Sequence, residues 1–339
     1  MDANRSNPYP VDVPDGSRRG RGRLVRIAFL GLCTCSALSF AGMLVAPLAL
    51  FAHFQAWWAT AWALGLLLWL LLPRVRGAFW RPRAARRVAQ TLLLSHTLAV
   101  AWLWWPMEEP QFEGGSGVEL VFYNLHTREQ PWQALRASFG DTPPDLLALV
   151  EAKHALLDPP PEYPHALRSQ QGGLVLYSRL PLQRTKVHSE AGMRDVLETE
   201  VVLPRGRMHL VVTHPNNHAA RSHDREHRRL AGIVGSLAYQ DMPLIVVGDL
   251  NTTRWSQQMR HLLQVSGLRA TCCDGRGPHV TWSPLPGLPL GLAIDHLLVG
   301  PRIAVDRLEW LPWAPEADHR GLRAALRVDA RPRQDLLGD

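Results

Sequence analysis

The chain of 339 residues has only four cysteines, and their spacing excludes a structural zinc site. Cys33 and Cys35 lie inside an apolar run, whereas Cys272 and Cys273 are adjacent. A structural zinc site takes its ligands in pairs, each separated by roughly two to four residues. A zinc-stabilised fold is therefore excluded. The adjacent pair is compatible with a strained disulfide or with two free thiols, and the sequence leaves both open.

Most of the chain also lacks a surplus of positive charge. The first 110 residues carry twelve arginines, no lysine and five acidic residues, which accounts for the whole net charge of +7. The remaining residues hold 25 basic and 25 acidic side chains. A protein that grips nucleic acid usually concentrates basic residues in its binding domain, so a nucleic-acid substrate is not favoured. A local cluster around Arg225 is compatible with binding a substrate phosphate, or with the solvated start of a helix capped by Ser222.

Polar residues are scarce between positions 27 and 105. Three apolar runs, at residues 27–50, 54–72 and 88–105, approach or exceed the roughly 20 residues that cross a bilayer. The third run is the least apolar because it contains several polar residues, among them His96. A cleaved signal peptide fits poorly, since its apolar region is shorter and stands alone. We therefore predict three transmembrane helices, with the lipid bilayer as a partner.

Arginine placement predicts how these helices are oriented. The twelve arginines fall at residues 5–26, before the first run, and at residues 74–87, between the second and third. Because positively charged segments stay in the cytoplasm, both clusters are assigned to that side. A multi-pass protein of the inner or plasma membrane follows, with its C-terminal domain on the non-cytoplasmic side.

The composition predicts five segments along the chain. The first is a disordered basic leader, and a membrane domain, a short linker, a folded domain and a tail follow. In the folded domain, strand-like runs alternate with helical ones, and neighbouring strand-like runs favour an antiparallel or mixed sheet over a doubly wound parallel one. The predicted segments are residues 1–26, 27–105, 106–117, 118–328 and 329–339.

The most informative stretch is PLIVVGDLNTTR at residues 243–254. Its apolar run predicts a buried strand that stops at Gly248 and presents Asp249 and Asn251 on the same side. A carboxylate and an amide placed in this way can hold a water molecule and a phosphate. The alternative is a strand that simply ends in an Asx turn.

Other polar residues also stand at the ends of apolar runs. Asn124 ends VELVFYN, Glu151 ends LLALVE and His214 ends HLVVTH. Asp295 interrupts LAIDHLLV, and Asp318 and His319 precede GLRAAL. In type and order these residues resemble the endonuclease/exonuclease/phosphatase superfamily, over roughly residues 116–328. The resemblance implies a two-sheet, four-layer α/β sandwich and a metal-dependent phosphodiesterase or phosphatase.

The resemblance also implies a role for each of these residues. Glu151 would bind Mg²⁺ or Mn²⁺, with Asn124 beside the metal and the phosphate and Asp318 as a further metal contact. Asp249 would position and deprotonate the attacking water, and Asn251 would bind the phosphoryl oxygen or the base. His319 would donate to the phosphoryl oxygen, oriented by Asp295, and His214 would be a second phosphate donor. The last motif departs from the common pattern, because Ala317 replaces a supporting serine.

Three apolar runs before such a domain resemble the VanJ-type membrane proteins of this superfamily. That likeness implies a lipid-linked phosphate or pyrophosphate of the cell envelope as the substrate. Two alternatives remain open from the sequence. One is a metal-dependent nuclease, and the other is a membrane-tethered binding module without enzymatic activity.

Overall fold

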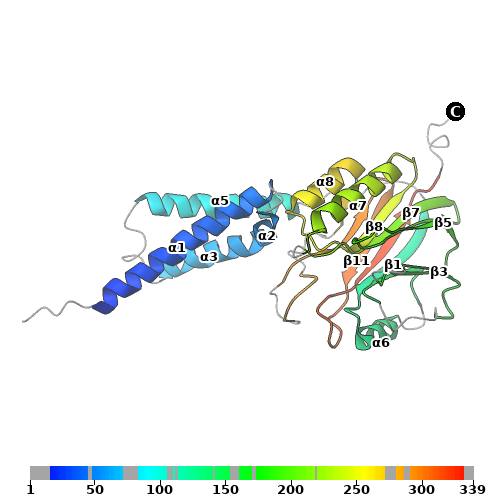
Figure 1. Ribbon diagram of the computed structural model, residues 1–339, viewed down its shortest axis with the longest axis horizontal. Coiled ribbons are helices and arrows are strands. Elements are labelled where there is room, and N and C mark those ends of the chain that lie inside the picture. Colours follow the sequence, from blue (N-terminus) through cyan, green and yellow to red (C-terminus); the bar gives the residue numbers. More distant parts are fainter. Residues whose placement is uncertain are drawn as a thin grey trace, which may run out of the picture.

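The computed structural model describes residues 16–44, 48–71, 83–104, 110, 114–139, 142–152, 160–169, 173–217, 220–271, 280–285 and 291–331. An elongated group of N-terminal helices leads into a larger α/β domain (Figure 1). Some predicted features lie outside the described residues. They are residues 1–15 of the leader, most of the linker, residues 332–339 of the tail and the cysteine pair at 272–273.

Helices occupy each of the three predicted apolar runs. They are α1 (Gly16–Gly42), α3 (Gln55–Leu71) and α5 (Arg83–Trp104), and the short α2 (Ala49–Ala52) lies between the first two. Disorder was predicted for residues 16–26, and that prediction is wrong because α1 begins at Gly16. The arginines of this stretch are good helix formers and run without a break into the apolar segment.

Within the part of the chain that the structure describes, no helix combines the length and the apolar character needed to cross a bilayer. The predicted transmembrane spans at 27–50, 54–72 and 88–105 are therefore not confirmed.

The α/β domain contains two six-stranded sheets. The first has the order β11-β12-β1-β2-β4-β3, and the second has the order β5-β6-β7-β8-β10-β9. Only β1 with β2 and β7 with β8 pair in parallel among the described strands, and the other pairs are antiparallel. The predicted two-sheet sandwich is therefore confirmed, and both sheets are mixed, which is one of the two arrangements that the sequence favoured. The strands are β1 (Ser116–Asn124), β2 (Leu146–Val150), β3 (His165–Arg168), β4 (Val175–Ser178), β5 (Leu182–His188), β6 (Val196–Leu203), β7 (Gly206–Thr213), β8 (Leu244–Asp249), β9 (Arg269–Ala270), β10 (Asp295–Val299), β11 (Ile303–Trp310) and β12 (Leu322–Val328).

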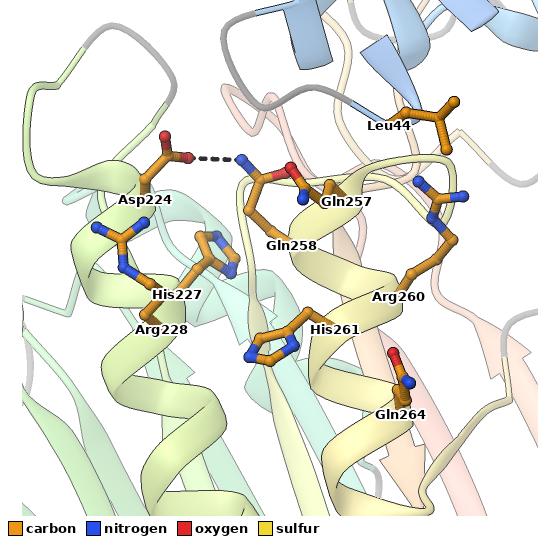
Figure 2. A pocket seen from close by; sticks show the side chains of 9 residues that line it. All are labelled: Leu44, Asp224, His227, Arg228, Gln257, Gln258, Arg260, His261 and Gln264. Atoms are coloured by element: carbon orange, nitrogen blue, oxygen red, sulfur yellow. Dashed lines mark hydrogen bonds between the residues drawn. The ribbon is translucent and has the colours of Figure 1, made fainter. Parts of the chain in front are cut away.

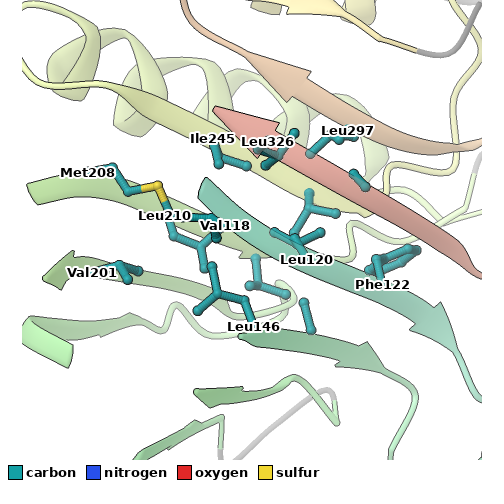
Figure 3. Packing of buried hydrophobic residues seen from close by; sticks show 14 of the residues in the cluster. Val118, Leu120, Phe122, Leu146, Val201, Met208, Leu210, Ile245, Leu297 and Leu326 are labelled. Carbon is teal, nitrogen blue, oxygen red and sulfur yellow. The ribbon is translucent and has the colours of Figure 1, made fainter. Parts of the chain in front are cut away.

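The main core lies between the two sheets. Alternate residues of each central strand face it, as Leu120 and Phe122 of β1 and Ile245 of β8 do (Figure 3). Because side chains alternate along a strand, the intervening residues face outward, where they pack against helices. Helix α6 (Glu129–Ser138) covers the first sheet, whereas α7 (His223–Ala238) and α8 (Gln257–Ser266) cover the second (Figure 1).

Candidate active site

The ends of central strands from both sheets meet at one edge of the sandwich. Asn124 is the last residue of β1, and Asp249 is the last residue of β8. The amide Nδ2 of Asn124 donates a hydrogen bond to Oδ2 of Asp249 over 3.1 Å. Both side chains are almost fully buried. A direct bond therefore joins the two sheets where the predicted site residues converge.

Asp249, Asp295 and His319 form a buried group at this edge. Asp295 lies directly opposite Asp249 in the antiparallel pairing of β8 and β10. The Nδ1 of His319 donates to Oδ2 of Asp295 over 2.9 Å, and its Nε2 lies 3.7 Å from Oδ2 of Asp249. The imidazole therefore stands between two carboxylates, as predicted for a histidine oriented by Asp295.

This arrangement shifts the proton affinities of two members. Burial and the neighbouring Asp295 carboxylate raise the pKa of Asp249 to about 7. Burial alone would lower the pKa of His319, but the charge and hydrogen bond of Asp295 raise that pKa to about 10. Near neutral pH, His319 is therefore a cationic donor, and Asp249 can take up a proton.

A second group lies beside the first and is more open to solvent. The Nε2 of His214 lies 3.5 Å from Oε1 of Glu151 and 3.6 Å from Oδ2 of Asp249, so it links the two groups. The Nδ1 of His126 lies 3.7 Å from Oε2 of Glu151 and 3.4 Å from Oδ1 of Asp318. The side chains of Glu151 and Asp318 are 23% and 26% exposed. A ligand can therefore reach these carboxylates from solvent.

Backbone strain is concentrated in the loops that carry this group. His126, Thr127 and Glu151 all have positive φ angles, of 47°, 57° and 53°. Such angles are uncommon for residues other than glycine and often mark functional sites. Two hydrogen bonds hold the conformation, from His126 N to Asn124 Oδ1 at 2.9 Å and from Thr127 N to the Glu151 carbonyl at 3.0 Å.

The second group fits a divalent cation better than the first. Ligand atoms of Asp249, Asp295 and His319 do lie within 4.8 Å of one another. Their polar atoms already bond to one another and to neighbouring groups, however, and both carboxylates are at most 2% exposed. In contrast, Oδ1 of Asp318 accepts no hydrogen bond and faces Nδ1 of His126 over 3.4 Å. Because a carboxylate oxygen without a hydrogen bond is free to accept a cation, Glu151, Asp318 and His126 suit a divalent cation better than the first group does.

Two predicted site residues are placed differently from the expectation. Asn251 has φ 48° and lies beyond the end of β8, so strand alternation does not align it with Asp249. Its N–H donates to Oδ1 of Asp249 over 2.8 Å, and its side chain donates to the carbonyl of Pro215 over 3.0 Å. The Asx turn considered as the alternative is therefore present. Arg225 lies on the exposed face of α7, and no described contact links it to the site.

Three residues near the site were not predicted from the sequence. His126 follows Asn124 by two positions, in a loop rather than at the end of an apolar run. The indole of Trp282 donates to Oδ2 of Asp318 over 3.1 Å. The buried Glu226 accepts hydrogen bonds from the backbone and side chain of Asn216, over 2.6 and 2.7 Å, and so fixes the loop that follows His214. An acidic residue on the buried stripe of a helix was the available signal for Glu226.

A separate hollow of about 500 Å³ lies between α7, α8 and Leu44 of the N-terminal segment (Figure 2). No residue of the two groups above lines it. Its arginines, Arg228 and Arg260, lie on opposite sides of the hollow and do not converge (Figure 2). The carboxylate of Asp224 is bonded to Gln258 over 2.6 Å. The hollow therefore lacks the convergent polar groups of an active site.

Comparison with known proteins places this site in a family. The Endonuclease/Exonuclease/phosphatase family matches residues 122–319, which is more than half of the chain. No curated protein matches the chain.

Solved structures share the fold at low sequence identity. A functionally unknown conserved protein from Enterococcus faecalis V583 is 13% identical with a TM-score of 0.52, covering 62% of this chain and 100% of that one. The human Nocturnin catalytic domain with bound sulfate is 15% identical with a TM-score of 0.51, covering 62% of this chain and 94% of that one. The 3′-5′ exonuclease NExo from Neisseria meningitidis is 18% identical with a TM-score of 0.50, covering 61% of this chain and 98% of that one. With its matching fold and clustered motif residues, the chain belongs to the endonuclease/exonuclease/phosphatase family and is a metal-dependent hydrolase of phosphoester bonds.

Proposed function

We propose that this protein is a membrane-anchored phosphoesterase that acts outside the cytoplasm on a lipid-linked phosphate or pyrophosphate of the cell envelope. One observation carries the proposal: the N-terminal helices expose many large apolar side chains and hold several polar residues inside. Soluble helical bundles have the opposite arrangement, with an apolar interior and a polar surface.

The exposed surface of these helices is unusually rich in large apolar side chains. A soluble protein rarely exposes a contiguous apolar patch of this kind, whereas a lipid-facing surface requires one. Among the described residues, eleven of the thirteen large hydrophobic side chains that are exposed belong to this segment. They are Ile27, Leu30, Leu44, Leu50, Leu64, Leu67, Leu68, Leu71, Val88, Leu94 and Leu98.

Polar side chains of the same helices are buried and bonded to one another. The Nε1 of Trp62 donates to the hydroxyl of Ser36 over 2.8 Å, which links α3 to α1. His96 of α5 and Gln55 of α3 bond over 2.6 Å, and both are buried. Helices in a bilayer commonly associate through such internal polar contacts. His96, a polar residue of the third apolar run, thereby receives a role in packing.

The position of the helices supports the proposed orientation. The connection between α1 and α3 and the C-terminal end of α5 lie beside the α/β domain, and the N-terminal end of α1 lies at the far end (Figure 1). The arginines at residues 18–26 and 83–87 belong to the starts of α1 and α5. Cytoplasmic arginines would therefore leave the α/β domain on the opposite side of the membrane.

Mg²⁺ or Mn²⁺ is the proposed cofactor, held by Glu151 and Asp318 with Asn124 adjacent and His126 as a nitrogen donor. A bound cation supplies positive charge where negative charge develops on the phosphoryl group. The protein's own residues supply the rest of the chemistry. Asp249 accepts the proton of the attacking water, and protonated His319 donates to a phosphoryl oxygen.

The remaining predicted residues support these two. Asp295 holds His319 in its protonated form. His214 faces the carboxylates of Glu151 and Asp249 and is a second donor to phosphate. Asn251 orients Asp249 through its backbone N–H. Because no described contact links the exposed Arg225 to these residues, its proposed contact with substrate is limited to a part of the substrate that extends beyond the phosphate.

A nuclease is the second candidate. The structural likeness to the Neisseria exonuclease favours it. The balanced charge of residues 111–339 weighs against it, because nucleic-acid affinity depends strongly on phosphate neutralisation by basic residues.

The full-length protein in lipid nanodiscs provides the test. Phosphate release from a polyprenyl pyrophosphate, cleavage of a sphingomyelin-like phosphodiester and nicking of plasmid DNA are measured with Mg²⁺ and with EDTA, beside Asp249→Asn. We expect the lipid substrates to be cleaved only with metal and only by the unaltered enzyme. Plasmid cleavage that exceeds lipid cleavage and falls steeply with salt would establish the nuclease instead. No cleavage of any substrate would support a binding module.

Topology is tested separately with a reporter enzyme fused after Trp105. Reporter activity outside the cytoplasm is expected. Activity confined to the cytoplasm would overturn the exported orientation and would favour an intracellular substrate.

A further inference from the structure

The N-terminal segment contacts the active-site loops directly. His53 lies in the short connection between α2 and α3 and is only 4% exposed. Its Nδ1 accepts a hydrogen bond from the backbone N–H of Thr253 over 3.2 Å and bonds to the hydroxyl of Thr253 over 2.8 Å. An unprotonated Nδ1 accepts both bonds, so the proton of the neutral ring is on Nε2. Two residues 200 positions apart are thereby joined.

Thr253 belongs to the loop that carries the proposed base. This loop starts at Asp249, the last residue of β8, and passes through Asn251 in its left-handed conformation. It then leads into α8, where Ser256 is the N-cap and bonds to the hydroxyl of Thr252 over 2.7 Å. A loop with a strained residue needs external contacts to keep one conformation. His53 supplies such a contact four residues after Asp249.

A second contact reaches the loop that leads to Asp295. Trp57 lies in the first turn of α3, and its Nε1 donates to the carbonyl of Gly291 over 3.0 Å. Gly291 packs so tightly that a Cβ atom there would lie 1.9 Å from the carbonyl oxygen of Trp282. Trp282 in turn holds the carboxylate of Asp318. Displacing Gly291 would therefore disturb the segments that carry both Asp295 and Asp318.

We infer that His53 and Trp57 are positioning residues, through which the N-terminal helices hold the Asp249 loop and the Asp295 loop in catalytic geometry. The helices are then part of the active-site framework in addition to any role as an anchor. The inference rests on the phosphoesterase activity of the site and is independent of whether the helices cross a bilayer. His53 and Trp57 both lie outside the family match, which covers residues 122–319.

Hydrogen exchange of the full-length protein tests the contacts without requiring a substrate. In His53→Ala, we expect faster exchange of the amides in residues 250–256, and in Trp57→Phe faster exchange in residues 291–297. Two variants serve as matched controls. Trp58→Phe removes an indole bond to the carbonyl of Phe51 within the helical segment, and His261→Ala removes an exposed imidazole of α8.

Kinetics then separates positioning from a general loss of structure. With bis(p-nitrophenyl) phosphate as the probe, kcat should fall about tenfold in His53→Ala, as loss of roughly one hydrogen bond predicts, while KM changes little. His53→Asn should restore most of kcat, because its side-chain oxygen can accept the bond from Thr253. The inference is overturned if His53→Ala matches His261→Ala in exchange, or if Asn restores nothing. Failure of the proposed chemistry is recognised separately, as equal activity of Asp249→Asn and the unaltered enzyme.

Discussion

Asp249 and Asp295 face each other across the antiparallel pair β8 and β10, with His319 bonded to one and close to the other. Two like charges in direct register would normally repel. Here burial and the second carboxylate keep a proton in the group, either on Asp249 or on His319. This cross-strand pair therefore sets the charge of the site and predicts how activity and stability depend on pH.

Asp295→Asn should change the alkaline side of the pH–rate profile. The unaltered enzyme keeps His319 protonated up to a pKa of about 10, mainly because Asp295 offsets the effect of burial. Without that charge, the pKa of the imidazole should fall towards or below 6.5. We expect kcat to fall about 100-fold at pH 8 and its decline to begin at lower pH. Asp306→Asn, which alters an exposed ion pair with Arg327, is the control. An unchanged alkaline limb would exclude the proposed role of Asp295.

Asp249→Asn should abolish activity and change the pH dependence of stability. Folding raises the pKa of this carboxyl group from its ordinary value of 3.8 to about 7. A raised pKa means that the folded state binds the proton more tightly than the unfolded state. The contribution to stability is therefore complete below about pH 4 and is lost as the pH rises through about 7.

The amide side chain of the Asp249→Asn variant does not titrate, so this loss of stability should be absent from the variant. Its free energy of unfolding, relative to the unaltered protein, should be higher at pH 8 than at pH 5. Urea denaturation without divalent metal at the two pH values measures this difference. If the difference between the two proteins is the same at both pH values, Asp249 is not a buried group with a raised pKa.

His126→Ala should change metal preference. An imidazole nitrogen favours later transition metals, whereas Mg²⁺ prefers oxygen ligands. We expect the variant to lose about tenfold in affinity for Co²⁺ but little for Mg²⁺. Glu151→Gln should weaken both metals, because it removes a charged oxygen ligand. Isothermal titration calorimetry provides the affinities, with His261→Ala as the control. Equal losses for the two metals would show that His126 does not act as a ligand.

The residues at strand ends were predictable because an apolar run fixes where a strand ends. Asn124 and Asp249 were placed in this way, and the two sheets bring them into direct contact. The side chain of Asn251 could not be placed, because alternation holds only within a strand and this residue adopts a left-handed conformation.

Other features depend on contacts between distant parts of the chain. His126 lies in a loop without an apolar pattern, and only the fold brings Glu151 and Asp318 to it. The bond between His53 and Thr253 spans 200 residues. Local patterns contain no information about such a pairing, and the position of His53 between two apolar runs predicted to be an anchor gave no reason to expect a contact with the active-site loops.

Gly248→Ala should destabilise the second sheet just before the proposed base. A Cβ atom at this position would lie 1.9 Å from the carbonyl oxygen of Thr213, in the strand that pairs in parallel with β8. Because the Cβ is fixed directly to the backbone of one central strand and the oxygen belongs to the backbone of its neighbour, neither can move without breaking the pairing. We expect a loss of about 3 kcal/mol in unfolding free energy and loss of activity through displacement of Asp249.

Gly232→Ala is the matched control for this substitution. Gly232 lies in the middle of α7, and a Cβ atom there would meet nothing within 4 Å. Because alanine favours a helix more than glycine does, this variant should gain about 0.5–1 kcal/mol and keep full activity. Urea denaturation and phosphodiester hydrolysis measure both effects. If Gly248→Ala is as stable and active as Gly232→Ala, the close approach of β7 and β8 does not determine the position of Asp249.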